Sequence, residues 1–167
     1  MLKKIVLFAV VMFPVIAFAQ ESQKIAYVNY SDVIYAMPET KQMQDSLTKS
    51  QNEFQAELKI ITDEYQKKLS DYVAQRDSLN ASIKLRREAE LNEVQQRGAN
   101  FEQYAAQKQD ELQQALATPI TNKLQKAIND VGAENNFLYI ANSQAFLYIA
   151  PNATDATPLV KKKLGIQ

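Results

Sequence analysis

Residues 38–78 read PETKQMQDSLTKSQNEFQAELKIITDEYQKKLSDYVAQRDS, and residues 83–131 read IKLRREAELNEVQQRGANFEQYAAQKQDELQQALATPITNKLQKAINDV. Apolar residues recur in both stretches at intervals of three and four, with mostly Gln, Glu, Lys, Asp and Ser between them, which predicts long amphipathic helices. The apolar stripe is too narrow for a globular core and fits the seam of a coiled coil. The stripe consists of Leu47, Phe54, Leu58, Ile61, Tyr65, Leu69, Tyr72, Leu91, Val94, Phe101, Leu112, Leu116, Leu124 and Ile128.

The two helices are expected to form an antiparallel hairpin, because one helix of this total length does not fit inside a compact domain. The turn is expected near residues 77–82, the one cluster of helix-poor polar residues within the stretch. The return helix is expected to run from about Ile83 to Val131. Pro119 predicts a kink near the root of the arm. The return seam is weaker, because Gly98 and Ala105 are small and Lys108 is charged, so we expect a flexible arm.

Short β-like runs flank this arm. Residues 25–29 (IAYVN) predict one strand, and residues 137–141 (FLYIA) predict a second. Residues 145–150 (AFLYIA) are expected to be the hairpin partner of the second strand, after a turn at residues 142–144. These strands are nearly all apolar, so both faces should be covered, by helix on one side and by other subunits on the other. Six residues are assigned to this oligomer-forming body, of which the last four are expected to be buried: Ile25, Tyr27, Leu138, Ile140, Phe146 and Tyr148.

The predicted organisation has three parts. Residues 1–19 are expected to be a cleaved signal peptide, with Lys3 and Lys4 before an apolar run and a small-x-small cleavage site at residues 17–19. The alternative, a membrane anchor, is disfavoured because the run is short and contains Pro14. Residues 20–37 and 120–167 are expected to form the β-containing oligomerisation body, and residues 38–119 the hairpin arm.

The composition excludes several classes of function. The chain has no Cys and no His, so disulfides, thiol redox chemistry and the commonest general base and metal ligand are absent. Three glycines do not allow a phosphate-binding loop. Loss of Lys3 and Lys4 would leave 17 basic against 19 acidic residues, which does not suggest a nucleic-acid binder. We expect no enzyme activity and no cofactor or metal.

Two sets of arm residues are candidates for binding, each with a plainer alternative. The aromatic side chains could contact an apolar guest, or they could simply fill the seam. The basic residues around the tip could meet anionic lipid, lipopolysaccharide or an acidic client, or they could serve solubility alone. The aromatic set is Phe54, Tyr65, Tyr72, Phe101 and Tyr104, and the basic set is Lys67, Lys68, Arg76, Lys84, Arg86 and Arg87.

The arrangement resembles the Skp/OmpH family of periplasmic chaperones. The resemblance lies in the strand at residues 25–29, the residues Met37-Pro38-Glu39, two long Gln/Glu/Lys-rich helices, a hydrophobic β segment and the C-terminal sequence DATPLVKKKLGI at residues 155–166. It implies a mainly α, Skp-like fold, in which a helical hairpin arm projects from a short three-stranded β element.

The resemblance further implies a periplasmic homotrimer whose arms surround a cavity. Such a trimer would hold unfolded outer-membrane β-barrel proteins without ATP. The sequence departs from strongly basic family members, because the processed chain would carry a net charge of −2. A second hypothesis is a structural coiled-coil spacer or adaptor of the cell envelope with a folded partner, although Gly98, Ala105 and Lys108 weaken the stiff seam that a spacer needs.

Overall fold

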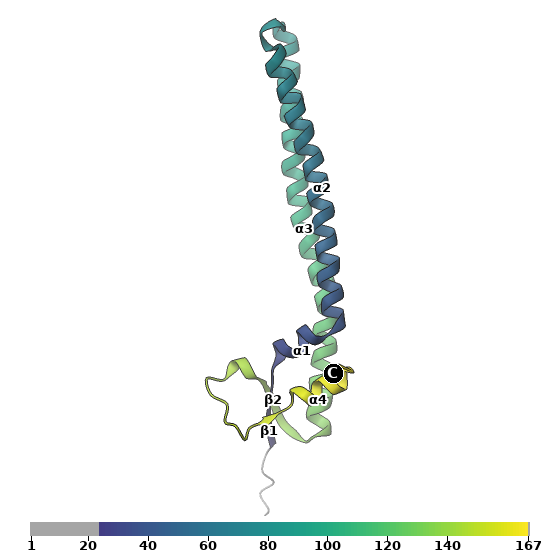
Figure 1. The fold of residues 1–167 in the computed structure, drawn as a ribbon, viewed down its shortest axis with the longest axis vertical. Coiled ribbons are helices and arrows are strands. Elements are labelled where there is room, and N and C mark those ends of the chain that lie inside the picture. The colour runs from purple at the N-terminus through teal and green to yellow at the C-terminus, as the bar shows by residue number, and fades with distance from the viewer. Residues whose placement is uncertain (1–23, 167) are drawn as a thin grey trace, which may run out of the picture.

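The computed structural model describes residues 24–166, so the predicted signal peptide lies outside the described residues. Two regions are distinct in Figure 1: a long arm made of two helices, and a small body at one end of it. We call residues 38–119 the arm and the remaining described residues the body. The predicted mainly α fold with a small three-stranded β element is confirmed.

The arm consists of α2 (Pro38–Gln75) and the greater part of α3 (Ala81–Glu134). Between them lie the short 3-10 helix η1 (Arg76–Ser78) and Asn80, whose side-chain oxygen accepts a hydrogen bond from the backbone N–H of Ile83. At about 1.5 Å per residue, the 38 residues of α2 extend about 57 Å.

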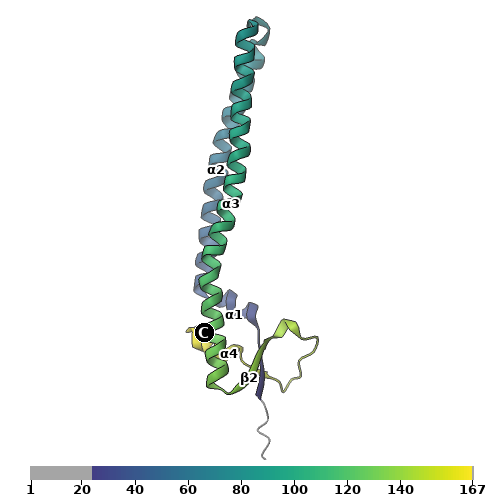
Figure 2. The same cartoon turned by 180° about the vertical axis from the view of Figure 1, so that it is seen from behind.

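The two helices lie side by side in both views (Figures 1 and 2) and run in opposite directions. Their contacts show this, because partners on α3 fall in number as those on α2 rise: Glu39 pairs with Lys123, Glu64 with Arg97, and Tyr72 with Glu88. The return helix extends three residues beyond the expected end at Val131, and it continues through Pro119 without interruption.

Packing in the arm is uneven along its length. Ile61, Leu91 and Val94 are buried towards the tip, and the next deeply buried layer is Ile120 and Leu124, where α3 enters the body. The positions between these two layers are only partly covered, including Leu47, Phe54, Phe101 and Leu112. Most side chains of the arm therefore remain accessible along a two-helix structure.

The sheet of the body contains β1 (Lys24–Val28), β2 (Phe137–Asn142) and β3 (Thr154–Asp155), in the order β2-β1-β3. Both pairings are parallel, with Ala26 opposite Ile140 on one side and opposite Thr154 on the other. Parallel neighbours need a crossover connection, and here the whole arm connects β1 to β2.

The predicted hairpin between residues 137–141 and 145–150 is wrong. After β2 the chain forms the 3-10 helix η2 (Ser143–Ala145), in which the side chain of Asn142 accepts a hydrogen bond from the backbone N–H of Gln144. This cap turns the chain away from β2, and residues 146–150 belong to no strand. An apolar run in a sequence indicates burial or strand pairing, but it does not identify the strand that it pairs with. The short strand Thr154–Asp155, which pairs with β1, was therefore not predicted from the sequence.

The body core lies where α1 (Tyr30–Ala36), the root of the arm and α4 (Thr157–Leu164) meet one face of the sheet. Its largest fully buried side chains are Val33, Met37, Leu124 and Val160. The C-terminal segment is joined to β1 by hydrogen bonds from Ala156 N to Tyr27 O (2.8 Å) and from Asn29 N to Thr157 Oγ1 (2.9 Å). Gly165, with a φ of 73°, ends α4 in the left-handed conformation that favours glycine.

Three of the four apolar body residues that were expected to be buried are exposed in the single chain, so their burial by other subunits stays a prediction. Leu138, Phe146 and Tyr148 are 57%, 42% and 78% exposed, whereas Ile140 is half-buried against the core. The helices cover one face of the sheet, whereas the other face is covered only in part, by the segment after η2.

Candidate functional site

Three of the five candidate aromatic residues meet near the middle of the arm. The ring of Phe54 on α2 lies 6.1 Å from Phe101 and 6.4 Å from Tyr104 on α3, both in edge-to-face geometry. The ammonium of Lys108 lies 5.9 Å from the centre of the Tyr104 ring. Tyr104 is half exposed, so this cluster joins the two helices and also offers an aromatic surface to solvent.

The other two candidate tyrosines lie nearer the tip and do not join this cluster. Tyr65 is half-buried on the α2 side of the seam. The hydroxyl of Tyr72 donates a 2.5 Å hydrogen bond to the carboxylate of Glu88, and this bond raises the pKa of Tyr72. The aromatic set therefore does not make one continuous surface.

The six basic residues around the tip divide into two groups of three. Lys68, Arg86 and Arg87 all lie within 4 Å of carboxylate oxygens of Glu90, and the hydrogen bond from Arg87 lowers the pKa of that carboxyl group. Lys68 also lies 3.9 Å from Glu64. The other three form no ion pair within the described part of the chain: Lys67, Arg76 and Lys84. The positive charge of the tip is therefore lower than a count over residues 67–87 suggests, because Glu88 and Glu90 follow directly.

The root of the arm carries its own ion pairs. Lys123 on α3 binds Glu39 at the start of α2, and this hydrogen bond lowers the pKa of Glu39. Lys161 on α4 lies 2.8 Å from Asp32 on α1, and Lys163 binds Glu134 at the end of α3. These contacts fix where the arm leaves the body.

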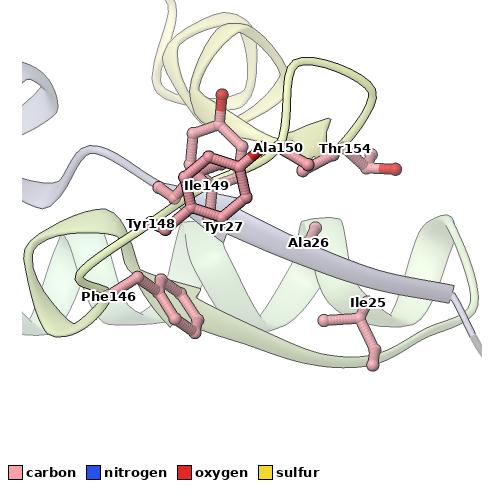
Figure 3. Close-up of a pocket in the computed structure, with 9 residues that line it drawn as sticks. Ile25, Ala26, Tyr27, Phe146, Tyr148, Ile149, Ala150 and Thr154 are labelled. Carbon is pink, nitrogen blue, oxygen red and sulfur yellow. The ribbon is translucent and has the colours of Figure 1, made fainter.

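The outer face of the sheet contains an apolar hollow of about 180 Å³. Figure 3 shows that β1 contributes Ile25 and Tyr27 and that the segment after η2 contributes Phe146 and Tyr148. Leu147, which lies between Phe146 and Tyr148 in the sequence, is fully exposed. Exposed apolar surface of this kind is typical of interaction sites. Four of the six body residues predicted from the sequence line the hollow, and the other two, Leu138 and Ile140, lie on β2.

Within residues 24–166, none of the helices is long and apolar enough to cross a membrane. Residues 24–164 match the family described as outer membrane protein (OmpH-like), whereas no curated protein matches the chain. The match includes the strands, the whole of α4 and the whole arm, as expected from the resemblance. The protein therefore belongs to the OmpH-like family, a family of periplasmic chaperones for outer-membrane proteins.

Proposed function

We propose that this protein is an ATP-independent holdase, which binds unfolded outer-membrane β-barrel proteins in the periplasm and prevents their aggregation. The observation that carries the proposal is the arm: two helices extend far from a small body and keep most of their side chains accessible. Membership in a chaperone family supports the same role. The proposed clients are unfolded β-barrel precursors.

The working form is proposed to be a homotrimer. The uncovered apolar side chains of the body, chiefly Leu138, Phe146, Leu147 and Tyr148, would be costly in a monomer. The edge of β2 is also unpaired within the described residues, and an exposed edge strand is a ready partner for another chain. Contact between three bodies would cover this face, and the three arms would then surround a shared cavity.

Binding inside such a cavity would depend on many weak contacts. The Phe54–Phe101–Tyr104 cluster offers aromatic surface, and the partly covered seam allows each arm to bend towards guests of different size. Several arms acting on one client raise the effective concentration of binding sites without any single strong contact. Release needs no ATP, because folding into the outer membrane is the more stable end state for the client.

Strong electrostatic capture of acidic clients is not part of this proposal. The processed chain would have a net charge of −2, and three of the six basic tip residues already pair with carboxylates. We therefore expect clients to be held mainly by apolar contacts, so that client binding changes little with ionic strength.

Dilution of a urea-unfolded outer-membrane protein into buffer, with and without residues 20–167 of this protein, tests the holdase function by light scattering. A holdase suppresses the scattering increasingly as its concentration is raised, whereas a spacer or adaptor leaves it unchanged. Light scattering coupled to size exclusion tests assembly separately. A folded monomer at micromolar concentration would contradict the trimer.

A further inference from the structure

A continuous groove runs along one face of the arm between α2 and α3. It consists of two adjoining hollows of about 400 Å³ and 320 Å³, which share Leu58 of α2 and Glu102 of α3 as lining residues. The groove extends along α2 from Gln51 to Tyr65. At 1.5 Å per residue this is about 21 Å, the length of about six residues of extended chain.

Small residues on α3 leave room for this groove. Gly98 and Ala99 line one hollow, and Ala105 and Ala106 line the other, one pair seven residues after the first. This spacing repeats a position on the same face of the helix. The floor between them is apolar, with contributions from Phe54, Leu58 and Ile61 of α2 and from Val94 and Phe101 of α3.

Most polar side chains of the groove are amides, and Thr62 and Tyr65 add hydroxyl groups. Four glutamines line it, Gln51, Gln55, Gln95 and Gln109, and each amide can both donate and accept hydrogen bonds. The Oε1 atom of Gln109 is buried and accepts no hydrogen bond within residues 24–166, although its Nε2 donates to Leu47 O at 3.3 Å.

The one charged side chain that lines the groove is Glu102, which lies where the two hollows meet. No lysine or arginine lines either hollow, and Glu102 forms no ion pair within the described part of the chain, whereas Glu64, Glu90 and Glu111 do. The groove thus presents an apolar floor, amide groups and one uncompensated negative charge near its centre. This charge is complementary to a cationic side chain.

We propose that this groove binds an extended segment of unfolded polypeptide, with small apolar side chains on the groove floor and a lysine or arginine beside Glu102. The amides of the groove would bind the main chain of the segment, which every unfolded sequence provides. The inference rests on the proposed holdase function and adds to it a site and a preference. Client segments with a basic residue between apolar ones are favoured over segments with an acidic residue there.

Filling the groove tests its location. The double variant Ala99→Phe/Ala106→Phe places two rings on exposed positions of the groove, and Ala89→Phe/Ala115→Phe is the matched control on exposed positions of α3 outside it. The probe is the fluorescein-labelled peptide Ser-Val-Ser-Lys-Ser-Val-Ser, followed by anisotropy. Loss of a valine-sized contact should weaken its binding about tenfold in the filled variant, with no change in the control. Equal binding by both variants, or no binding of the peptide to the wild type up to millimolar protein, overturns the proposal.

Exchange of charge tests the preference. The lysine peptide should bind about two- to fivefold more tightly than the same peptide with a central glutamate, the range expected for one partly exposed ion pair. Glu102→Lys should reverse that order, and Glu102→Gln should abolish the difference. An order unchanged in Glu102→Lys contradicts the role of this carboxylate.

The chain contains no cysteine, so a single introduced thiol reports directly on a client. Bound urea-unfolded outer-membrane protein should slow alkylation of Ala106→Cys and leave alkylation of Ala89→Cys unchanged. If the wild type and the filled variant prevent aggregation equally well, the groove proposal fails and the holdase function stands. If the wild type prevents no aggregation but still binds the lysine peptide through Glu102, the holdase function fails and the groove remains a peptide site.

Discussion

The arm and the body of this protein are stabilised by different amounts of buried surface. In the body, side chains from β1, α1, α3 and α4 converge on one core, in which Val33, Leu124 and Val160 are fully buried. In the arm, two helices share a single seam, and only the layer around Ile61, Leu91 and Val94 is deeply covered. Rigidity is therefore concentrated in the body, whereas the proposed binding surface of the arm is loosely packed. Local opening is easiest where few apolar contacts have to be broken.

The largest effect is expected from a cavity in the body. Leu124→Ala removes a fully buried side chain and should lower the free energy of unfolding by about 3–5 kcal/mol. Urea denaturation at one fixed protomer concentration measures this, because the proposed assembly would make stability depend on concentration. Leu85→Ala, at a position 70% exposed near the tip, is the control and should change it by under about 0.5 kcal/mol. Equal losses would mean that the arm and the body do not differ as described.

A cavity in the arm should destabilise only the helices around it. Ile61→Ala removes the most buried side chain of α2 between root and tip, and we expect a cost of about 2 kcal/mol, at the low end for such truncations because one face of the seam is open. Hydrogen exchange should therefore accelerate in the tip half of α2 and α3 and stay unchanged in β1 and α4. Faster exchange throughout the body would show that the arm and the body unfold as one unit.

Some of these features could be predicted from the sequence, and the reasons differ from one region to the other. The long helices could be predicted, because periodic apolar spacing is a local signal that repeats over many turns. The parallel sheet could not be predicted, because pairing of β1 with β2 and with Thr154–Asp155 joins segments far apart in the chain. The same limit explains the wrong hairpin at residues 145–150.

The candidate site shows the same contrast. The sequence identified the rings that meet at Phe54, Phe101 and Tyr104, because they follow the seam. It treated Gly98 and Ala105 only as weak points of that seam, whereas both line the groove. The sequence does contain a signal for the groove, the repeat of small residues at 98–99 and 105–106. A groove, however, depends on how two helices pack together, and the residue pattern of one helix does not contain that information.

Substitution of the glycines by alanine should change the free energy of unfolding by less than the two cavity variants do. Whether it stabilises or destabilises the protein depends on the backbone conformation of each glycine. A Cβ on Gly98 would lie 3.5 Å from Ile61 Cγ2, and one on Gly132 would lie 3.7 Å from Ile140 Cδ1, both ordinary contact distances. Gly98→Ala and Gly132→Ala should each stabilise α3 by up to about 1 kcal/mol. The first should appear as slower hydrogen exchange in the arm, and the second as a higher urea midpoint.

Gly165→Ala is the opposite control, because its φ of 73° is unfavourable for alanine. It should destabilise the protein by about 1 kcal/mol. If Gly98→Ala slowed exchange in the body as well as the arm, the two regions would be energetically coupled after all.

The smallest predicted effect lies at the junction of the two regions, where Lys123 binds Glu39. The hydrogen bond from Lys123 lowers the pKa of Glu39 below its ordinary value in the folded protein. The stabilisation is therefore fully present above the unfolded pKa of about 4.3 and is lost as pH falls through the lower folded pKa. Because about a third of the Glu39 side chain is exposed, we expect this ion pair to contribute well under about 1 kcal/mol to the free energy of unfolding.

Glu39→Gln should reduce stability slightly at pH 7 and not at pH 2.5, as measured by urea denaturation of both proteins at each pH. Glu57→Gln, on the same helix and without an ion pair within the described residues, should show no such pH-dependent difference. A loss of equal size at both pH values would mean that Glu39 acts through packing at the root and not through its charge.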